Sequence, residues 1–173
     1  MAGSHLHAAP TATIRSVCNL YNMAPRDHVE VYFRAIVPDN YQQVTVGPFG
    51  LGAIVRADAA GLELVIAQWG MIAPGSKTRR PTSHAILTNN ARAETVATRP
   101  TYRSAWSAGR RCLIPAAWYQ EPNWEIGRHI PWRMRRADSA PWALAGLWSE
   151  WTDPVTGEIV PNFTMLTVNC DGH

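Results

Sequence analysis

The stretch LGAIVRADAAGLELVIAQWGMI, residues 51–72, carries the clearest information about the fold. It contains two apolar runs, 51–56 and 62–72, on either side of a polar segment from Asp58 to Gly61. Short apolar runs that flank a turn containing glycine are typical of paired strands. The stretch therefore predicts two strands joined by a polar turn.

Similar strand signals recur along the rest of the chain. Segments rich in apolar and aromatic residues, with turn residues between them, cover 85–94, 110–121, 129–136, 142–151 and 158–168. We find no internal repeat and no linker. These patterns predict a single α+β domain of mostly antiparallel, twisted, barrel-like sheets with a few short helices.

Two short helices are expected between the strands. Asp27 can cap the first, which runs through about Ile36, and Thr98 can cap the second, which starts near Pro100. Gly109 is a plausible end for the second helix. The apolar face of the first helix would comprise Val29, Phe33 and Ile36.

Residues 1–17 resemble an extension rather than part of the fold, which we place at 18–173. They are small and polar and show no hydrophobic periodicity. Val17 is notable because GTG, a valine codon, is also a bacterial start codon. A native start there, followed by removal of the initiator methionine, would make Cys18 the N-terminal residue. N-terminal sequencing of the native protein would test this hypothesis.

The charge is unevenly distributed. Of 16 basic residues, 12 lie between Lys77 and Arg136 with only three acids, so this stretch carries about +9 (12 − 3). Such clustering indicates an anionic partner. Fifteen of the bases are arginine, which matches phosphate oxygens well. A GC-rich codon bias is an alternative explanation for the arginine excess, but it does not explain the clustering.

The remaining composition excludes several classes of protein. No apolar stretch approaches the roughly 20 residues of a membrane span, and 1–17 lacks the apolar run of a signal peptide. The three cysteines, Cys18, Cys112 and Cys170, form no CxxC pair and no metal-ligand spacing. We therefore expect a cytoplasmic monomer without metal or cofactor, in a reducing compartment.

NARAET, from Asn90 to Thr95, is the sharpest local pattern. In an extended strand Asn90, Arg92 and Glu94 would project from one face and the two alanines from the other. This places an amide, a guanidinium and a carboxylate side by side. On composition alone, an ordinary Arg–Glu pair on a solvated sheet face is the more common explanation.

Two further patterns contain candidate reactive groups. In RRCLIPAAWYQEPNW, residues 110–124, Glu121 follows two aromatic residues, and such surroundings raise a carboxyl pKa toward that of a general acid or base. In CNLYN, residues 18–22, an N-terminal Cys18 would offer an amine and a thiol that together close a thiazolidine ring on an aldehyde. Taken alone, a core position for Trp118 and Tyr119 with Glu121 in a turn is the more common explanation, and a lone cysteine is usually a small buried hydrophobe.

Together and in this order, these patterns resemble the SOS-response-associated peptidase (SRAP) family of abasic-site processing proteins. The resemblance covers Cys18 to about Val168. Its motifs are CNLYN, WGMIAPG (69–75), NARAETV, RCLIPAAWYQEP, ALAGLW (143–148) and FTMLTVN (163–169).

The resemblance implies a set of residue roles. Cys18 would form a thiazolidine crosslink with the ring-opened deoxyribose of an abasic site in single-stranded DNA. Asn90 would hold the amine and sugar, and Glu121 would act as the acid or base. It also implies an associated autopeptidase activity in the DNA damage response, with the protein on the nucleoid when bound. The residues expected to contact DNA are Arg92, Trp69, Gly70, Arg79, Arg80, Arg99, Arg103, Arg110 and Arg111.

The chain departs from the family pattern at three places. Residues 1–17 precede Cys18 and would block its amine. The family usually has Gly-Arg after the cysteine, where Asn19 and Leu20 stand here. A histidine that the family uses in catalysis lies in a later segment, and we do not assign its role to His173.

Two other functions are compatible with the residues. A thiol hydrolase could use Cys18 or Cys112 with a histidine such as His84 or His129, although no local signature supports it. A plain single-strand-binding module could use arginine and tryptophan without covalent chemistry. A protein–DNA crosslink that survives denaturation would distinguish covalent capture of an abasic site from non-covalent single-strand binding.

Overall fold

The computed structural model describes residues 18–83, 87–123, 128 and 130–168. Its elements are β1 Leu20–Met23, α1 Arg26–His28 with a continuing π-helical turn Val29–Phe33, β2 Thr45–Val46, β3 Leu51–Ala57, β4 Leu62–Trp69, β5 Asn90–Arg92, α2 Arg103–Ser107, β6 Arg111–Asn123, β7 Ile130–Met134, β8 Trp142–Thr152 and β9 Ile159–Thr167. Among the described residues, no helix is long and apolar enough to cross a membrane.

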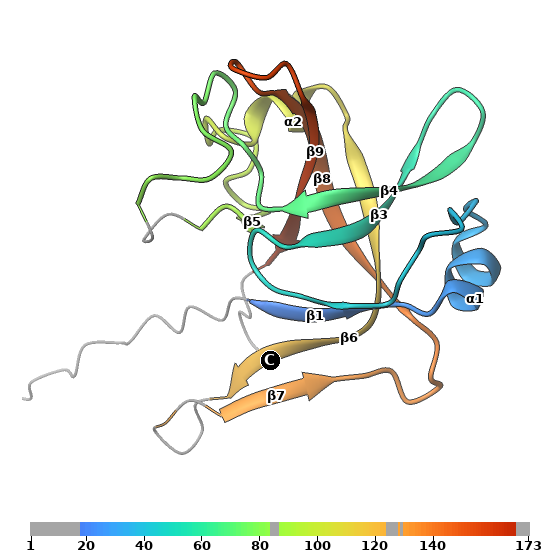
Figure 1. Cartoon of the computed structure of the whole chain (residues 1–173). Helices are drawn as coiled ribbons and strands as arrows, with labels where there is room; N and C mark the ends of the chain where they lie inside the picture. The colour runs from blue at the N-terminus through green and yellow to red at the C-terminus, as the bar shows by residue number, and fades with distance from the viewer. Residues whose placement is uncertain (1–17, 84–86, 124–127, 129, 169–173) are drawn as a thin grey trace, which may run out of the picture.

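Strands β3, β4, β9, β8 and β6 pair in a closed ring and form a barrel; Figure 1 labels them. β3 pairs with β4, β4 with β9, β9 with β8, β8 with β6, and β6 returns to β3. Most of these pairings are antiparallel, but β9 lies parallel to both β4 and β5. The predicted α+β class with mostly antiparallel, barrel-like sheets is confirmed. The extension 1–17 lies outside the described residues.

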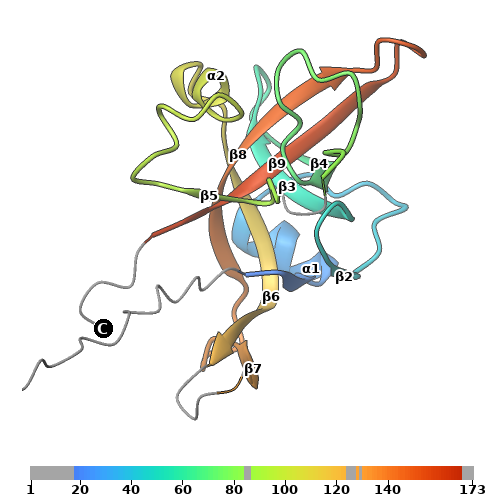
Figure 2. The same ribbon diagram turned by 90° about the vertical axis from the view of Figure 1, so that its left-hand side faces the viewer.

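The long strand β6 connects the barrel to the rest of the sheet. Its first half pairs with β8 from Arg111↔Leu147 onward, and its second half pairs with β1 and β7. The β6–β7 hairpin therefore projects beyond the barrel (Figure 2). Glu121 lies in this projecting part, next to β1.

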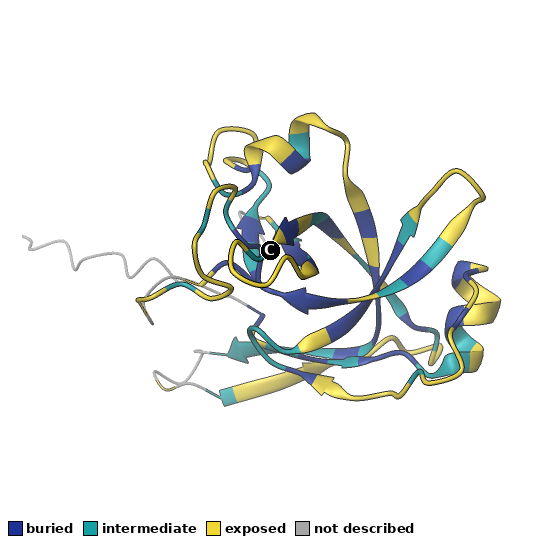
Figure 3. Cartoon of the chain, turned by 45° about the horizontal axis from the view of Figure 1, so that its top comes forward, coloured by how far each residue is buried: buried dark blue, intermediate teal, exposed yellow. Residues whose placement is uncertain are grey.

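The core fills the barrel with large side chains. Trp69, Tyr21 and Phe163 are fully buried, and the rings of Tyr21 and Trp69 meet edge to face at 5.0 Å. Burial of each such side chain is worth about 1.5–3 kcal/mol. Gly52 makes room for this packing, because a Cβ there would lie 1.9 Å from the Tyr21 hydroxyl. Figure 3 shows the buried residues along the barrel strands.

The strand–turn–strand prediction for residues 51–72 is confirmed. β3 and β4 pair in continuous register, and the Asp58 carboxylate accepts a hydrogen bond from the amide of Gly61 at 2.8 Å. The second strand ends at Trp69, earlier than predicted. Gly70 has a φ of 152°, and a Cβ there would lie 2.6 Å from the Phe49 ring, so the chain leaves the strand at a position that requires glycine.

The first helix differs from its prediction. Pro25 stands at the N-cap without a side-chain cap, and Asp27 lies within the first turn. Phe33 is buried as expected, but Ile36 is 85% exposed. The reason is that Arg34 adopts a left-handed conformation (φ 52°, ψ 30°), which ends the helical segment before Ile36.

The second helix and the strand before it are both shorter than predicted. α2 starts at Arg103, with Tyr102 rather than Thr98 at its N-cap, and the expected stop at Gly109 (φ 67°) is confirmed. The strand predicted over 85–94 contains β5 alone in its described part. The amide of Thr95 bonds the carbonyl of Arg92 at 3.1 Å, and this turn ends β5.

Candidate active site

The start of β1 and the start of β5 meet at one point of the sheet. The side-chain amide of Asn90 donates a hydrogen bond to the carbonyl oxygen of Cys18 at 2.7 Å. Asn89 also points its amide at this oxygen, at 3.4 Å. Two neighbouring asparagines thus hold the backbone of a residue about 70 positions away in the sequence.

Trp69 supports this contact from the core, through the backbone of Asn89. Its indole N–H donates to the carbonyl of Asn89 at 2.7 Å, and the amide of Met165 donates to the same oxygen at 2.8 Å. The ring itself is fully buried. The structure thus gives the Trp69 ring a supporting position in the core, and its expected place along a DNA channel stays a prediction.

The thiol of Cys18 is shielded from solvent, with 1% of the residue exposed. It donates a hydrogen bond to the carbonyl of Leu20 at 3.6 Å. Burial, and after it the negative charge of Glu121, raises the pKa of this thiol from 9.0 to about 12. The thiol is therefore protonated at neutral pH, and Glu121 lies near enough to act on it electrostatically.

Pairing between strands explains the approach of Glu121. β1 and β6 are antiparallel with Leu20 opposite Gln120, so the segment that precedes β1 runs along the end of β6. Glu121 follows Gln120 there and is half-buried. The structure thus brings together the three residues that the sequence motifs single out, Cys18, Asn90 and Glu121.

The alternation predicted for NARAET holds over β5 only. Asn90 and Arg92 are partly exposed, whereas Ala91 between them is buried. Glu94 lies beyond the strand in the turn, so it does not continue the face that Asn90 and Arg92 share in β5. Arg92 donates to the carbonyl of Val168 at 3.2 Å, which fixes its guanidinium beside the end of β9.

The oxygen of the Asn90 side chain is buried and accepts no hydrogen bond from the described residues. Buried polar atoms are usually satisfied, so an orphan acceptor calls for an explanation. This one belongs to the amide that contacts Cys18. It can accept a hydrogen bond from an ammonium group or a hydroxyl placed beside that residue.

Comparison with known proteins identifies the family. The model of the family described as SOS response associated peptidase (SRAP) matches residues 4–173. The chain belongs to this family. The SRAP chain is 31% identical over 112 residues to the abasic site processing protein YobE of Bacillus subtilis, covering 64% of this chain and 49% of that protein.

Other relatives extend the comparison. The abasic site processing protein HMCES of Xenopus tropicalis is 25% identical over 130 residues, covering 65% of this chain and 39% of that protein. The SRAP chain thus spans about half the length, or less, of these curated relatives. A crystal structure of a protein from Bordetella bronchiseptica matches with a TM-score of 0.78 and 35% identity, covering 90% of this chain and 74% of that one.

The arginines of the SRAP chain do not form one patch around Cys18. Arg110 and Arg111 lie at the opposite end of β6 from Glu121, where they stack on Trp148 and Trp106 with guanidinium-to-centroid distances of 5.2 and 4.7 Å. A basic stretch in the sequence is here spread over the fold.

The other predicted arginines lie on loops and on α2. Arg79 bonds the Gln68 side chain at 3.0 Å and lies 3.8 Å from the carboxylate of Glu158. Arg80 approaches the carbonyl of Phe49 at 3.5 Å. Arg99 and Arg103 are exposed.

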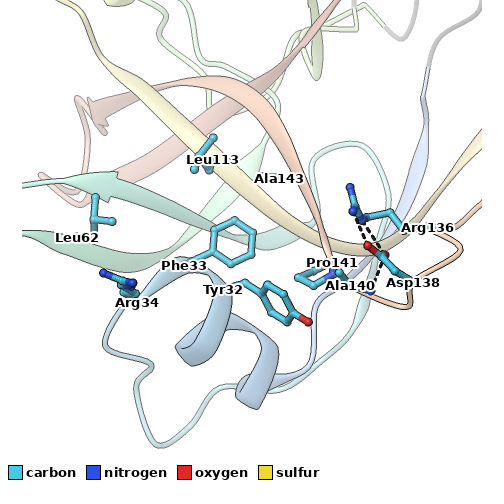
Figure 4. A pocket seen from close by; sticks show the side chains of 10 residues that line it. All are labelled: Tyr32, Phe33, Arg34, Leu62, Leu113, Arg136, Asp138, Ala140, Pro141 and Ala143. Atoms are coloured by element: carbon cyan, nitrogen blue, oxygen red, sulfur yellow. Dashed lines mark hydrogen bonds and ion pairs between the residues drawn. The ribbon is translucent and has the colours of Figure 1, made fainter.

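An open pocket of about 590 Å³ lies elsewhere, between the first helix and the loop after β7 (Figure 4). None of Cys18, Asn90 or Glu121 lines it. Its charged lining includes an ion pair between Arg136 and Asp138 at 2.6 Å. The candidate active site is therefore the meeting point of β1, β5 and β6, and not this pocket.

The residues that metal or thiol–histidine chemistry would use are only partly described by the structure. The described residues contain no group of three potential ligands that could hold a metal ion. Cys112 is buried, and burial raises the pKa of its thiol to about 12. His84 and His129 lie outside the described residues, as do Cys170 and His173.

Proposed function

We propose that this chain, with Cys18 as its N-terminal residue, captures abasic sites in single-stranded DNA as a covalent thiazolidine. The observation that carries the proposal is the 2.7 Å hydrogen bond from Asn90 to the Cys18 carbonyl, with the charge of Glu121 acting on the same cysteine. The names of the curated relatives supply the substrate class.

The chemistry begins with the open-chain aldehyde of the abasic deoxyribose. The free α-amine of Cys18 adds to the aldehyde carbon, and loss of one water gives an imine. The Cys18 sulfur then adds to the imine carbon, and the thiol proton goes to the nitrogen. One C–N bond and one C–S bond are formed, and water is the only product released.

The site suits this order of events. A thiol with a pKa near 12 is neutral at pH 7, so the amine is the first nucleophile and the thiol follows. Glu121 can protonate the sugar ring oxygen as the ring opens, and it can relay the thiol proton to the nitrogen as the sulfur adds. The orphan oxygen of Asn90 can hold the amine beside the aldehyde, which provides the gain of proximity.

We further propose that the same site hydrolyses the bond between Val17 and Cys18. Until that bond is cleaved, the nitrogen of Cys18 is an amide and cannot form an imine. The peptidase activity named for the family would then be self-processing. Loss of 1–17 on incubation, abolished in Cys18→Ala, would support this role for the site.

Intact-mass spectrometry tests the covalent product. A protein that starts at Cys18, mixed with an oligonucleotide carrying one abasic site, should give an adduct with the summed masses minus one water. A Cys18→Ser protein retains the amine but loses the thiol, so its imine should disappear on acid treatment. An acid-stable adduct with the serine variant would contradict thiazolidine formation.

A further inference from the structure

The β6–β7 hairpin places an exposed tryptophan directly opposite Glu121. In the antiparallel register, Glu121 faces Trp132 and Tyr119 faces Met134. Directly opposed residues share a face of the sheet, and adjacent strands lie about 4.8 Å apart. The indole of Trp132 therefore stands on the same face as the Glu121 carboxylate, one strand farther out.

Trp132 is 49% exposed, although an indole is among the largest apolar groups a protein can bury. Its neighbour on the same face, Met134, is also partly exposed, at 37%. Single exposed apolar residues are common on protein surfaces. What distinguishes Trp132 is its register against a residue of the candidate active site.

Arginines neighbour Trp132 along the chain, on the opposite face of β7. Arg133 projects from the other face of β7 and stacks on Trp118 at 4.1 Å, and Arg135 follows β7 in an exposed position. Flat aromatic surfaces interleaved with arginines are what proteins use to bind single strands, because bases stack and phosphates pair with guanidinium groups.

We propose that Trp132 stacks on the nucleobase adjacent to the abasic position and so sets that position against Cys18. This inference rests on the proposed function, because it assumes that the reacting sugar lies beside Glu121. A stacked neighbouring base would fix the register of a strand that has no base of its own at the reacting nucleotide.

The test compares two proteins on two oligonucleotides. The DNA is single-stranded and carries an unreactive tetrahydrofuran analogue of the abasic site, flanked either by bases or by further tetrahydrofuran units. The full chain and Trp132→Ala are titrated against each by fluorescence anisotropy. Trp132→Phe keeps an aromatic face at this position. Tyr32→Ala is the matched control, because it removes an exposed aromatic residue that lines the pocket beside the first helix.

Stacking predicts a pattern that a general loss of binding does not. Trp132→Ala should weaken binding to the base-flanked DNA about 5-fold or more, with little effect on the DNA that lacks neighbouring bases. Trp132→Phe and Tyr32→Ala should stay close to the parent. An unchanged affinity of Trp132→Ala, or an equal loss on both DNAs, would overturn the inference.

The two proposals fail in different ways. Crosslinking by the protein that starts at Cys18 is measured separately, with a reactive abasic site at saturating DNA. If the crosslink forms and Trp132→Ala binds like the parent, only the stacking inference is wrong. If the parent binds neither DNA and forms no crosslink, both proposals are wrong.

Discussion

Asn90 donates a 2.7 Å hydrogen bond to the carbonyl oxygen of Cys18, across 72 positions of the sequence. Cys18 lies just before β1 and Asn90 begins β5, and the two strands have different partners, β6 for β1 and β9 for β5. The contact therefore depends on the closed barrel. The contact holds Cys18, the residue that the proposed chemistry requires at the N-terminus.

Replacement of Asn90 by alanine should slow crosslinking about 10-fold or more, because it removes the donor to Cys18 and the acceptor for its amine. Asn90→Asp keeps the shape but cannot donate, so it should also be slow. The measurement is the single-turnover rate of adduct formation. Asn40→Ala, at an exposed loop position, is the matched control. A normal rate in both Asn90 variants would contradict the assigned role.

Replacement of Glu121 by glutamine should have two effects. Loss of the acid–base group should slow crosslinking about 100-fold. Loss of its charge should also lower the pKa of the Cys18 thiol below about 12. Alkylation of the thiol as a function of pH measures the second effect independently of DNA. Glu158→Gln, at an exposed ion pair, should change neither quantity.

Gly52→Ala should destabilise the fold by about 1–3 kcal/mol, as overpacking of a core does. The new Cβ would lie 1.9 Å from the hydroxyl oxygen of Tyr21, so the buried ring must move. Gly47→Ala is the control, because the nearest atoms there are 4.0 Å away. Urea unfolding measures the stability of both variants, and equal midpoints for Gly52→Ala and Gly47→Ala would contradict this account of the core.

Stability at high pH should depend on Cys112. Its pKa is raised from 9.0 to about 12 by burial, so folding favours the protonated thiol. The stabilisation is complete below pH 9 and is lost as the pH rises toward 12, at up to about 1.4 kcal/mol per pH unit. The free energy of unfolding of Cys112→Ala should therefore fall less steeply than that of the parent above pH 9. Parallel curves of unfolding free energy against pH for Cys112→Ala and the parent would contradict this role of Cys112.

The elements that depend on local pattern could be predicted from the sequence. The pairing of β3 with β4 follows from two apolar runs around the Asp58 turn, and the stop at Gly109 follows from its left-handed conformation. The end of the first helix could not be predicted, because Arg34 adopts a conformation that non-glycine residues seldom take.

The motifs singled out Cys18, Asn90 and Glu121, but sequence alone could not show their contact. That contact needs the parallel pairing of β5 with β9, which joins segments about 75 positions apart. Trp132 was missed because nothing in an isolated five-residue strand marks its register against Glu121. The arginines of the basic stretch are neighbours along the chain but are spread over the fold, and sequence alone could not show that arrangement.

A denaturing gel tests the central claim most directly. The full chain, a protein that starts at Cys18, and its Cys18→Ala variant are each incubated with single-stranded DNA carrying one abasic site. The proposed mechanism predicts a shifted band, stable to heat and detergent, for the protein that starts at Cys18 and none for the alanine variant. The full chain should shift only as residues 1–17 are removed. A stable shift that persists in Cys18→Ala, or no shift with any protein, would contradict covalent capture through Cys18.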